Sequence, residues 1–329
     1  MRPIECDGAA GDRQDPIFDE ALRALAKRVR PDRRLVRIRR DPVVTASSWT
    51  LELTELVFDR GESYRVIFKD LSRRLPAVED GAFKPRAILD PTRELWAYRN
   101  LLSAGELSSP KLLHSVSDEQ ADRHWLFLEP VDGIHLFEAS FGSAWEAAAQ
   151  WLARFHAGFL DPCSEASPLI RHTPETHRWW FRRALAIHDA PVAHLAGAHE
   201  RAISLLLEGP LSALHGEFYP SNILVEKNTG LIHPVDWEMA GIGPPLLDLA
   251  ALSAGLSSRE RQALLHAYLD EADRSGVPVP EGPIDSAMAA CRLLLAVQWL
   301  GWAPDWKPPS EHQFDWLSEA TLTAAEIVA

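Results

Sequence analysis

Apolar positions change their period along this chain, and the change divides it in two. Residues 35–44, 49–58 and 63–71 are three β-prone runs rich in branched and apolar residues, which predict β-strands. Residues 59–62, Asp-Arg-Gly-Glu, form a typical turn between the second and third runs. Because neighbouring strands with short connections pair antiparallel, the pattern predicts a small antiparallel sheet.

Helical spacing flanks and follows these strands. Residues 16–29 repeat apolar positions every three to four residues, and Asp90-Pro91 begins a second helix that extends to about residue 102. Two further strands are predicted at 111–117 and 124–129. From residue 144 the pattern is mostly helical, with helices expected at 144–159, 174–189, 192–207, 246–255, 259–274, 284–300 and 313–328.

The helical half is interrupted at residues 223–235, which predict a β-hairpin. Residues 223–226 and 231–235 are β-prone, and Lys-Asn-Thr-Gly at 227–230 is typical of a turn. Asn222 and Asp236 are equally far from Thr229 along the chain. We therefore expect the hairpin to bring these two side chains together at its open end.

These elements predict an α+β fold of two lobes. Residues 1–130 would form a small lobe with an antiparallel β-sheet and one main helix, and the polar segment 1–15 is expected to be loose. Residues 131–329 would form a larger, mostly helical lobe. A length of 329 residues suits two lobes better than one compact core.

The charge of the chain narrows the set of partners. Its formal net charge is −13, so nucleic acid and anionic membranes would be repelled, whereas a cationic small molecule is compatible. Three scattered cysteines are too few for a disulfide framework, which favours a reducing, cytoplasmic setting. The N-terminus has no apolar signal region, and the longest apolar run, 293–303, is too short to span a bilayer.

Polar residues around the predicted hairpin supply candidate chemistry. Glu217 precedes the hairpin, and Asn222 and Asp236 lie at its open end. Amide and carboxylate oxygens suit Mg²⁺, which keeps several waters and bridges substrate phosphates. Glu217 would then face an acceptor. The segment therefore predicts a phosphoryl-transfer site.

Two charged residues of the small lobe occupy apolar positions. Lys69 ends an apolar strand, and Glu94 lies on the apolar stripe of the helix after Asp90. Pairing them resolves both anomalies and would hold Lys69 where it can contact nucleotide phosphates. Taken separately, Lys69 could reach solvent at the strand edge, and Glu94 could be a first-turn acid favoured by the helix dipole.

Four short motifs follow one another along the larger lobe in an order that is typical of a known family. Residues 152–156 have the form Leu-x-x-x-His, residues 215–222 read His-Gly-Glu-Phe-Tyr-Pro-Ser-Asn, residues 236–237 are Asp-Trp, and residues 248–250 are Asp-Leu-Ala. Together with Lys69 and Glu94 they resemble the aminoglycoside phosphotransferase family, the small-molecule branch of the protein-kinase-like fold. The resemblance covers most of the chain.

This resemblance implies ATP and Mg²⁺ as cofactors. Lys69 would contact the phosphates, with Glu94 as its partner. The linker between the lobes would offer backbone groups of Leu128, Glu129 and Val131 to adenine, with ATP and GTP both open as nucleotides.

The resemblance also assigns the transfer step. Asn222 and Asp236 would bind Mg²⁺, with Glu238 as an outer-shell helper. Glu217 would orient the acceptor hydroxyl and take its proton. Two residues would support the loop 215–222 structurally: His215 and Asp248.

The chain departs from the family pattern at two places. The family loop reads H-G-D-x-x-x-x-N, and Glu217 replaces its aspartate. The extra methylene moves the carboxylate by on the order of 1 Å, which can cost about 100-fold where positioning carries catalysis. In a loose phosphoryl-transfer transition state, electrostatic stabilisation contributes more to the rate than the catalytic base does, so glutamate at this position is compatible with turnover. Residues 44–48 contain no glycine to wrap phosphates, so Ser47 and Ser48 would substitute.

We therefore expect an ATP- and Mg²⁺-dependent phosphotransferase acting on a hydroxyl of a small molecule, such as an aminoglycoside-like antibiotic, a natural product or a metabolite. The alternative is a nucleotide-binding pseudokinase or regulatory module with impaired transfer, which Glu217 and the glycine-free turn favour. Intact Lys69, Glu94, Asn222 and Asp236 favour the enzyme.

A protein kinase is disfavoured, because only residues 237–247 separate Asp236 from Asp248 and leave little to dock a peptide.

Several tryptophans lie in helical segments that line the acceptor site in the resembled family. They are either core residues or acceptor contacts: Trp179, Trp180, Trp299, Trp302, Trp306 and Trp316.

Overall fold

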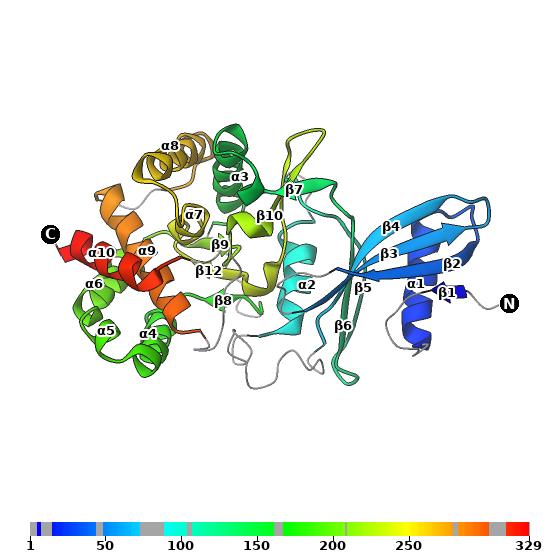
Figure 1. Ribbon diagram of the computed structural model, residues 1–329, viewed down its shortest axis with the longest axis horizontal. Coiled ribbons are helices and arrows are strands. Elements are labelled where there is room, and N and C mark those ends of the chain that lie inside the picture. Colours follow the sequence, from blue (N-terminus) through cyan, green and yellow to red (C-terminus); the bar gives the residue numbers. More distant parts are fainter. Residues whose placement is uncertain are drawn as a thin grey trace.

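The computed structural model of the protein describes residues 5–7, 15–43, 49–72, 89–103, 107–160, 167–207, 209–278, 282–302 and 314–328. A sheet-rich lobe holds the N-terminal part of the chain, and a larger helical lobe ends at the C-terminus on the opposite side of the molecule (Figure 1). This confirms the predicted α+β class and its two lobes. Among the described residues, no helix combines the length and apolarity needed to cross a membrane.

The small lobe is built on a six-stranded sheet of order β1-β2-β3-β4-β6-β5. Its strands are β1 (Glu5–Asp7), β2 (Leu35–Pro42), β3 (Thr50–Phe58), β4 (Ser63–Asp70), β5 (Leu112–Asp118) and β6 (Arg123–Leu128). Strands β2 to β6 pair antiparallel, as predicted. Strand β1 was expected to belong to a loose segment, but it pairs parallel with β2. Its polar sequence carries no local strand signal.

Alternation along β4 sends its side chains to two different faces. Val66 and Phe68 pack against α1 (Pro16–Val29) in an apolar cluster on one face of the sheet. Lys69 points to the other face, where it meets α2 (Pro91–Asn100), and its side chain is buried there. The pleat thus places one ammonium group between the sheet and the rest of the molecule.

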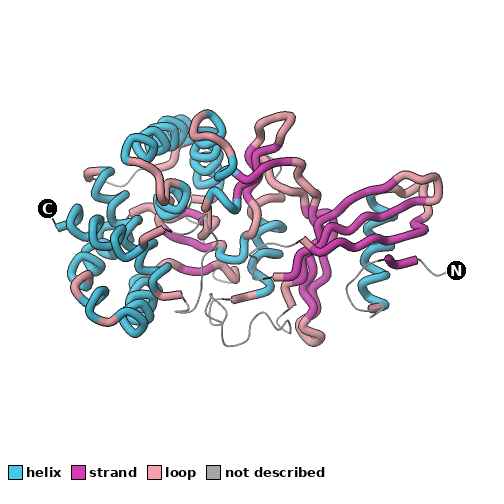
Figure 2. Tube along the Cα trace, viewed as in Figure 1, coloured by secondary structure: helices cyan, strands magenta, loops and turns pink. Residues whose placement is uncertain are grey.

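The larger lobe is assembled around one buried helix, α9 (Ile284–Leu300), which is apolar around most of its circumference. Helices α4, α6, α7 and α10 pack against it, and Figure 2 shows how helices dominate this lobe. The other helices of the lobe are α3 (Ser143–Gly158), α4 (Pro174–His188), α5 (Ala190–Ala193), α6 (Ala196–Leu207), α7 (Leu246–Leu252), α8 (Ser258–Ser275) and α10 (Trp316–Val328). The predicted helix 192–207 is in fact divided between α5 and α6.

Four short strands of this lobe escape prediction: β7 (Gly133–His135), β8 (Ile170–Arg171), β9 (Ser212–Leu214) and β12 (Gly241–Gly243). Runs of two or three residues are too short to show a period. Strand β7 adds to the hairpin strands β10 (Ile223–Glu226) and β11 (Ile232–Pro234), while β8, β12 and β9 form a second sheet. The second sheet holds the chain before residue 215 beside the chain after residue 240.

The predicted hairpin forms, but its register differs by one residue from the expected one. Ile223 pairs with Pro234, and the Val235 N–H donates to the Asn222 carbonyl over 2.9 Å. Asn222 therefore lies opposite Val235, and Asp236 lies one residue beyond the last pair. The turn contains four residues, 227–230, so its centre falls between two residues and not on Thr229.

Candidate active site

A buried aspartate braces the loop 215–222. The Asp248 carboxylate on α7 accepts the backbone N–H groups of His215 over 2.7 Å and of Gly216 over 2.9 Å, one on each oxygen. His156 Nε2 lies 3.5 Å from the same carboxylate, and its Nδ1 is 2.8 Å from the Tyr268 hydroxyl. These contacts support the structural role expected of Asp248.

The ring of His215 is bound by backbone on both sides. Its Nε2 lies 3.0 Å from the Val235 carbonyl, and its Nδ1 accepts the Glu217 N–H over 3.3 Å. A ring with one donating and one accepting nitrogen is neutral. The Trp237 ring covers it, with centroids 4.4 Å apart. Both ring nitrogens of His215 are thus engaged by backbone groups of the site.

Glu217 lies at the centre of the loop. Its side chain is buried at 3% exposure, and its carbonyl accepts the Tyr219 N–H over 2.7 Å and the Asn222 side-chain amide over 3.0 Å. Because Asn222 donates inward through Nδ2, its Oδ1 remains an acceptor. No hydrogen bond from the described residues reaches that oxygen.

Lys69 joins three elements at one point. Its Nζ lies 2.7 Å from Glu94 Oε2 on α2 and 2.7 Å from Asp236 Oδ1 after the hairpin, so the predicted Lys69–Glu94 pair is present. Asp236 adopts a left-handed backbone conformation with φ 66°. This conformation is uncommon for a residue with a Cβ atom and tends to occur at functional sites.

Burial and neighbouring carboxylates set the charges here. Burial lowers the pKa of Lys69, but Asp236, Glu94 and Glu238 more than offset this, so the pKa is higher than usual. Burial raises the pKa of Glu94; Lys69 opposes this shift and Asp236 adds to it. Lys69 is therefore charged at neutral pH. The surplus of carboxylates around it favours a further positive charge.

Two buried residues of the site were missed from the sequence. Arg93 donates Nη1 to the Glu238 carbonyl over 2.6 Å and Nε to the Pro168 carbonyl over 2.8 Å. The Trp49 indole donates to Glu238 Oε2. Arg93 could have been suspected as a second charged residue beside Glu94, whereas Trp49 is 189 residues from its partner and carries no local signal.

The donor set fits Mg²⁺. Asn222 and Asp236 both lie at the open end of the hairpin, and the Asp236 side chain is 22% exposed. An amide oxygen and a partly exposed carboxylate are hard ligands, and Mg²⁺ commonly takes one or two protein ligands and completes its shell with phosphates and water.

The predicted adenine linker is partly committed to the sheet. Leu128 ends β6 and pairs with Ile67, and the Glu129 N–H donates to the Lys111 carbonyl over 2.9 Å. That N–H is therefore engaged within the small lobe. Ser47 and Ser48, expected at the phosphates, lie outside the described residues.

Aromatic side chains extend from the loop into the large lobe. The Trp299 indole donates to the Tyr219 hydroxyl, and Trp299 stacks on Trp316 at 5.0 Å and packs on Trp302 at 4.0 Å. Trp299, Trp302 and Trp180 are buried as core residues. Trp306 lies outside the described residues.

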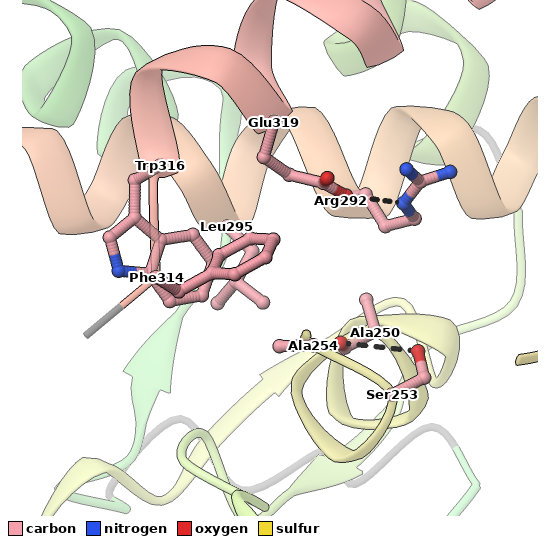
Figure 3. Close-up of a pocket in the computed structure, with 8 residues that line it drawn as sticks. All are labelled: Ala250, Ser253, Ala254, Arg292, Leu295, Phe314, Trp316 and Glu319. Carbon is pink, nitrogen blue, oxygen red and sulfur yellow. Dashed lines mark hydrogen bonds and ion pairs between the residues drawn. The ribbon is translucent and has the colours of Figure 1, made fainter. Parts of the chain in front are cut away.

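A small cavity lies at the far end of this aromatic row, between α7, α9 and α10 (Figure 3). Its wall includes an ion pair of Arg292 Nε with Glu319 Oε1 at 2.6 Å. The lining residues are Ala250, Ser253, Ala254, Arg292, Leu295, Phe314, Trp316 and Glu319. Of the residues predicted for the nucleotide, metal and transfer step, none lines it.

Comparisons with solved structures show which proteins share this fold. The fold is similar to choline kinase LicA from Streptococcus pneumoniae, with a TM-score of 0.60 and 14% identity over 94% of this chain and 99% of that chain. LicA has also been solved with AMP. A microcompartment-associated aminopropanol kinase has a TM-score of 0.57 and 16% identity over 89% and 90% of the two chains.

An aminoglycoside phosphotransferase from Streptomyces rimosus has a TM-score of 0.50 and 18% identity, over 88% of this chain and 100% of that one. A search of curated proteins finds no match. The model of one family, described as the phosphotransferase enzyme family, matches residues 55–282, which is more than half of the chain. With the protein-kinase-like fold and this match together, the chain belongs to the phosphotransferase enzyme family.

Proposed function

We propose that this chain transfers the γ-phosphate of Mg²⁺-ATP to a hydroxyl group of a small molecule. One observation carries the proposal: Lys69 Nζ lies 2.7 Å from both Glu94 and Asp236. A buried ammonium held by α2 and by the loop after the hairpin could bind phosphate at the junction of the lobes, which supports the proposal. Residues 1–130 would form the nucleotide-binding lobe, and residues 131–329 would carry the catalytic loop, the metal-binding hairpin and the acceptor site.

The nucleotide would lie between the lobes. Its base would contact the linker at Leu128, Glu129 and Val131, and Lys69 would hold the phosphates, with Ser47 and Ser48 as further donors. Asn222 and Asp236 would hold Mg²⁺, which when bound neutralises charge that develops on the phosphates.

Glu217 would orient the acceptor hydroxyl and take its proton. The loop supports this role because Asp248 and His215 fix its backbone on either side of Gly216. A rigid backbone is what a glutamate in place of aspartate needs, since positioning decides its efficiency.

We further propose a cationic amino alcohol as the acceptor. Two proteins of similar fold are named choline kinase and aminopropanol kinase, and both names denote alcohols with a positive nitrogen. A net charge of −13 favours the approach of such a cation. A cytoplasmic location would supply the ATP.

The test is a phosphorylation screen over amino alcohols, aminoglycosides, macrolides and nucleosides. Wild type should phosphorylate one class. Glu217→Gln should lower kcat by about 100-fold or more at unchanged thermal stability, because it keeps the size of the side chain and removes the base. Glu217→Asp serves as the conservative variant and should retain measurable turnover.

The same screen separates the enzyme from the pseudokinase alternative. The pseudokinase is favoured if wild type and Glu217→Gln both bind Mg²⁺-ATP but show no detectable phosphate transfer to any compound. Mg²⁺-ATP at about 100 times its Kd should stabilise the fold by roughly 2.7 kcal/mol. No thermal shift at saturation would remove the nucleotide assignment altogether.

A further inference from the structure

Two neighbouring strands of the small lobe reach the same loop of the large lobe. Lys69 on β4 bonds Asp236 over 2.7 Å, and Trp49, just before β3, donates its indole N–H to Glu238. Leu51 lies opposite Lys69 in the ladder between β3 and β4, so the two attachments leave the sheet at the same end. They arrive two residues apart on the loop 236–239. A third attachment comes from α2, where Arg93 bonds the Glu238 carbonyl, so three contacts together restrict the angle between the lobes.

The second attachment is shielded from water. Trp49 is 5% exposed and Glu238 is 3% exposed. A hydrogen bond to a buried carboxylate is stronger than one between neutral groups and costly to break. The backbone of Glu238 is held as well, because its carbonyl accepts Arg93 Nη1 over 2.6 Å. Glu238 is thus bound from β3 through its side chain and from α2 through its carbonyl.

The two attachments would respond differently to a nucleotide. Phosphates would compete with Asp236 for Lys69, and Mg²⁺ would compete with Lys69 for Asp236, so the first attachment would weaken on binding. The Trp49–Glu238 bond involves neither Lys69 nor the direct metal ligands proposed here, Asn222 and Asp236. It would therefore keep the end of the sheet against the loop 236–239 while the first attachment is exchanged.

We propose that Glu238 is a positioning residue that sets the closure of the two lobes on the nucleotide through its hydrogen bond to Trp49. This role rests on the proposed function and differs from the outer-shell metal role expected from the sequence. It predicts that removing one indole hydrogen next to β3 weakens nucleotide binding although that hydrogen does not touch the nucleotide.

The test is calorimetric binding of Mg²⁺-ATP to Trp49→Phe, which keeps an aromatic ring and removes the N–H. The Kd should rise by about 10-fold, as expected for one lost hydrogen bond to a charged group. Trp125→Phe is the matched control, since Trp125 is a buried tryptophan of the same sheet whose Nε1 has no hydrogen-bond partner among the described residues. Its Kd should stay within about twofold of wild type.

Glu238→Gln separates positioning from metal binding. A positioning role predicts that Trp49→Phe and Glu238→Gln raise the Kd of Mg²⁺-ATP non-additively, at an unchanged Mg²⁺ midpoint. A Mg²⁺ midpoint that rises in Glu238→Gln alone would show a metal ligand and overturn the proposal.

Equal Kd values for Trp49→Phe and Trp125→Phe would also overturn it, with the proposed function intact. Absence of Mg²⁺-ATP binding by wild type would instead overturn the proposed function and this role with it. Circular dichroism and thermal melting of each variant would confirm that the compared proteins are folded.

Discussion

At the scale of single residues, the loop 215–222 combines an unusual acid with tightly held surroundings. Glu217 replaces the aspartate of the family pattern, and the backbone on both sides of it is held by hydrogen bonds. Gly216 shows how little freedom the backbone has, with φ 83° and a Cβ position that would lie 2.0 Å from the Met239 carbonyl oxygen. Only glycine fits both the conformation and the space.

Gly216→Ala should therefore destabilise the protein by several kcal/mol, on the order of 3 or more, because strain and a backbone clash add. Chemical denaturation would measure the loss. Gly230→Ala is the matched control, since Gly230 has φ 71° but a Cβ atom there would meet no other atom within 4 Å. It should cost only about 1 kcal/mol. Equal losses in both variants would show that space at residue 216 is unimportant.

At the scale of elements, a group of three histidines, His172, His177 and His199, packs beside the chain that follows the hairpin. His172 follows β8 and lies against Gly241 and Gly243 of β12. Its ring is 5.4 Å from that of His177 on α4, and His199 on α6 lies near enough to shift the pKa of His177. This group of histidines therefore links two helices to the short sheet beside the candidate active site.

Burial keeps these rings neutral. It lowers the pKa of His172 to about 4, with Asp248 opposing, and the pKa of His199 to about 4, with Glu200 opposing. Burial also lowers the pKa of His177 well below its ordinary value, and the two other histidines lower it further.

The free energy of unfolding should thus fall as pH drops from about 6.5 towards 4. In that range the unfolded chain binds protons that the folded chain does not, which costs up to about 1.4 kcal/mol per pH unit for each histidine. Above pH 6.5 the slope from these groups should vanish. Urea unfolding of His177→Phe at pH 7 and pH 5 should show a decrease roughly 2 kcal/mol smaller than wild type. His194 is exposed, so His194→Gln is the control and should lose as much free energy of unfolding between pH 7 and pH 5 as wild type does. An equally large loss in His177→Phe would contradict the assignment.

At the scale of the whole molecule, charge and lobe arrangement act together. The whole chain has a formal net charge of −13, and the buried charged groups where the two lobes meet include more carboxylates than cations. Long-range attraction of a cation falls with ionic strength, because the Debye length shrinks from about 10 Å at 0.1 M to about 3 Å at 1 M salt.

For a cationic amino alcohol, kcat/KM should therefore fall by about 3-fold or more between 50 mM and 500 mM salt. For a neutral alcohol of similar size that the enzyme phosphorylates, salt should change kcat/KM only by weakening ATP binding. Saturating Mg²⁺-ATP removes that effect. Initial rates at saturating Mg²⁺-ATP measure both. Parallel salt responses of the two alcohols would show that the acidic charge does not select the acceptor.

Local periodicity was enough to predict most elements and part of the site. Alternation around Lys69 and helical spacing around Glu94 predicted a pair that the structure contains at 2.7 Å, because both signals lie within one strand or one helix. The short strands β8, β9 and β12 were not predictable, because two or three residues define no period and their pairing spans tens of residues.

Sequence patterns alone predicted most of the strands and helices, the loop that carries Glu217, and the pairing of Lys69 with Glu94. These depend on spacing between near neighbours. Only the tertiary structure decided the hairpin register, the left-handed turn at Asp236 and the contact of Trp49 with Glu238. The register follows from the length of the turn 227–230, whereas Asp236 and Glu238 are held by residues more than 160 positions away, because the two lobes meet there.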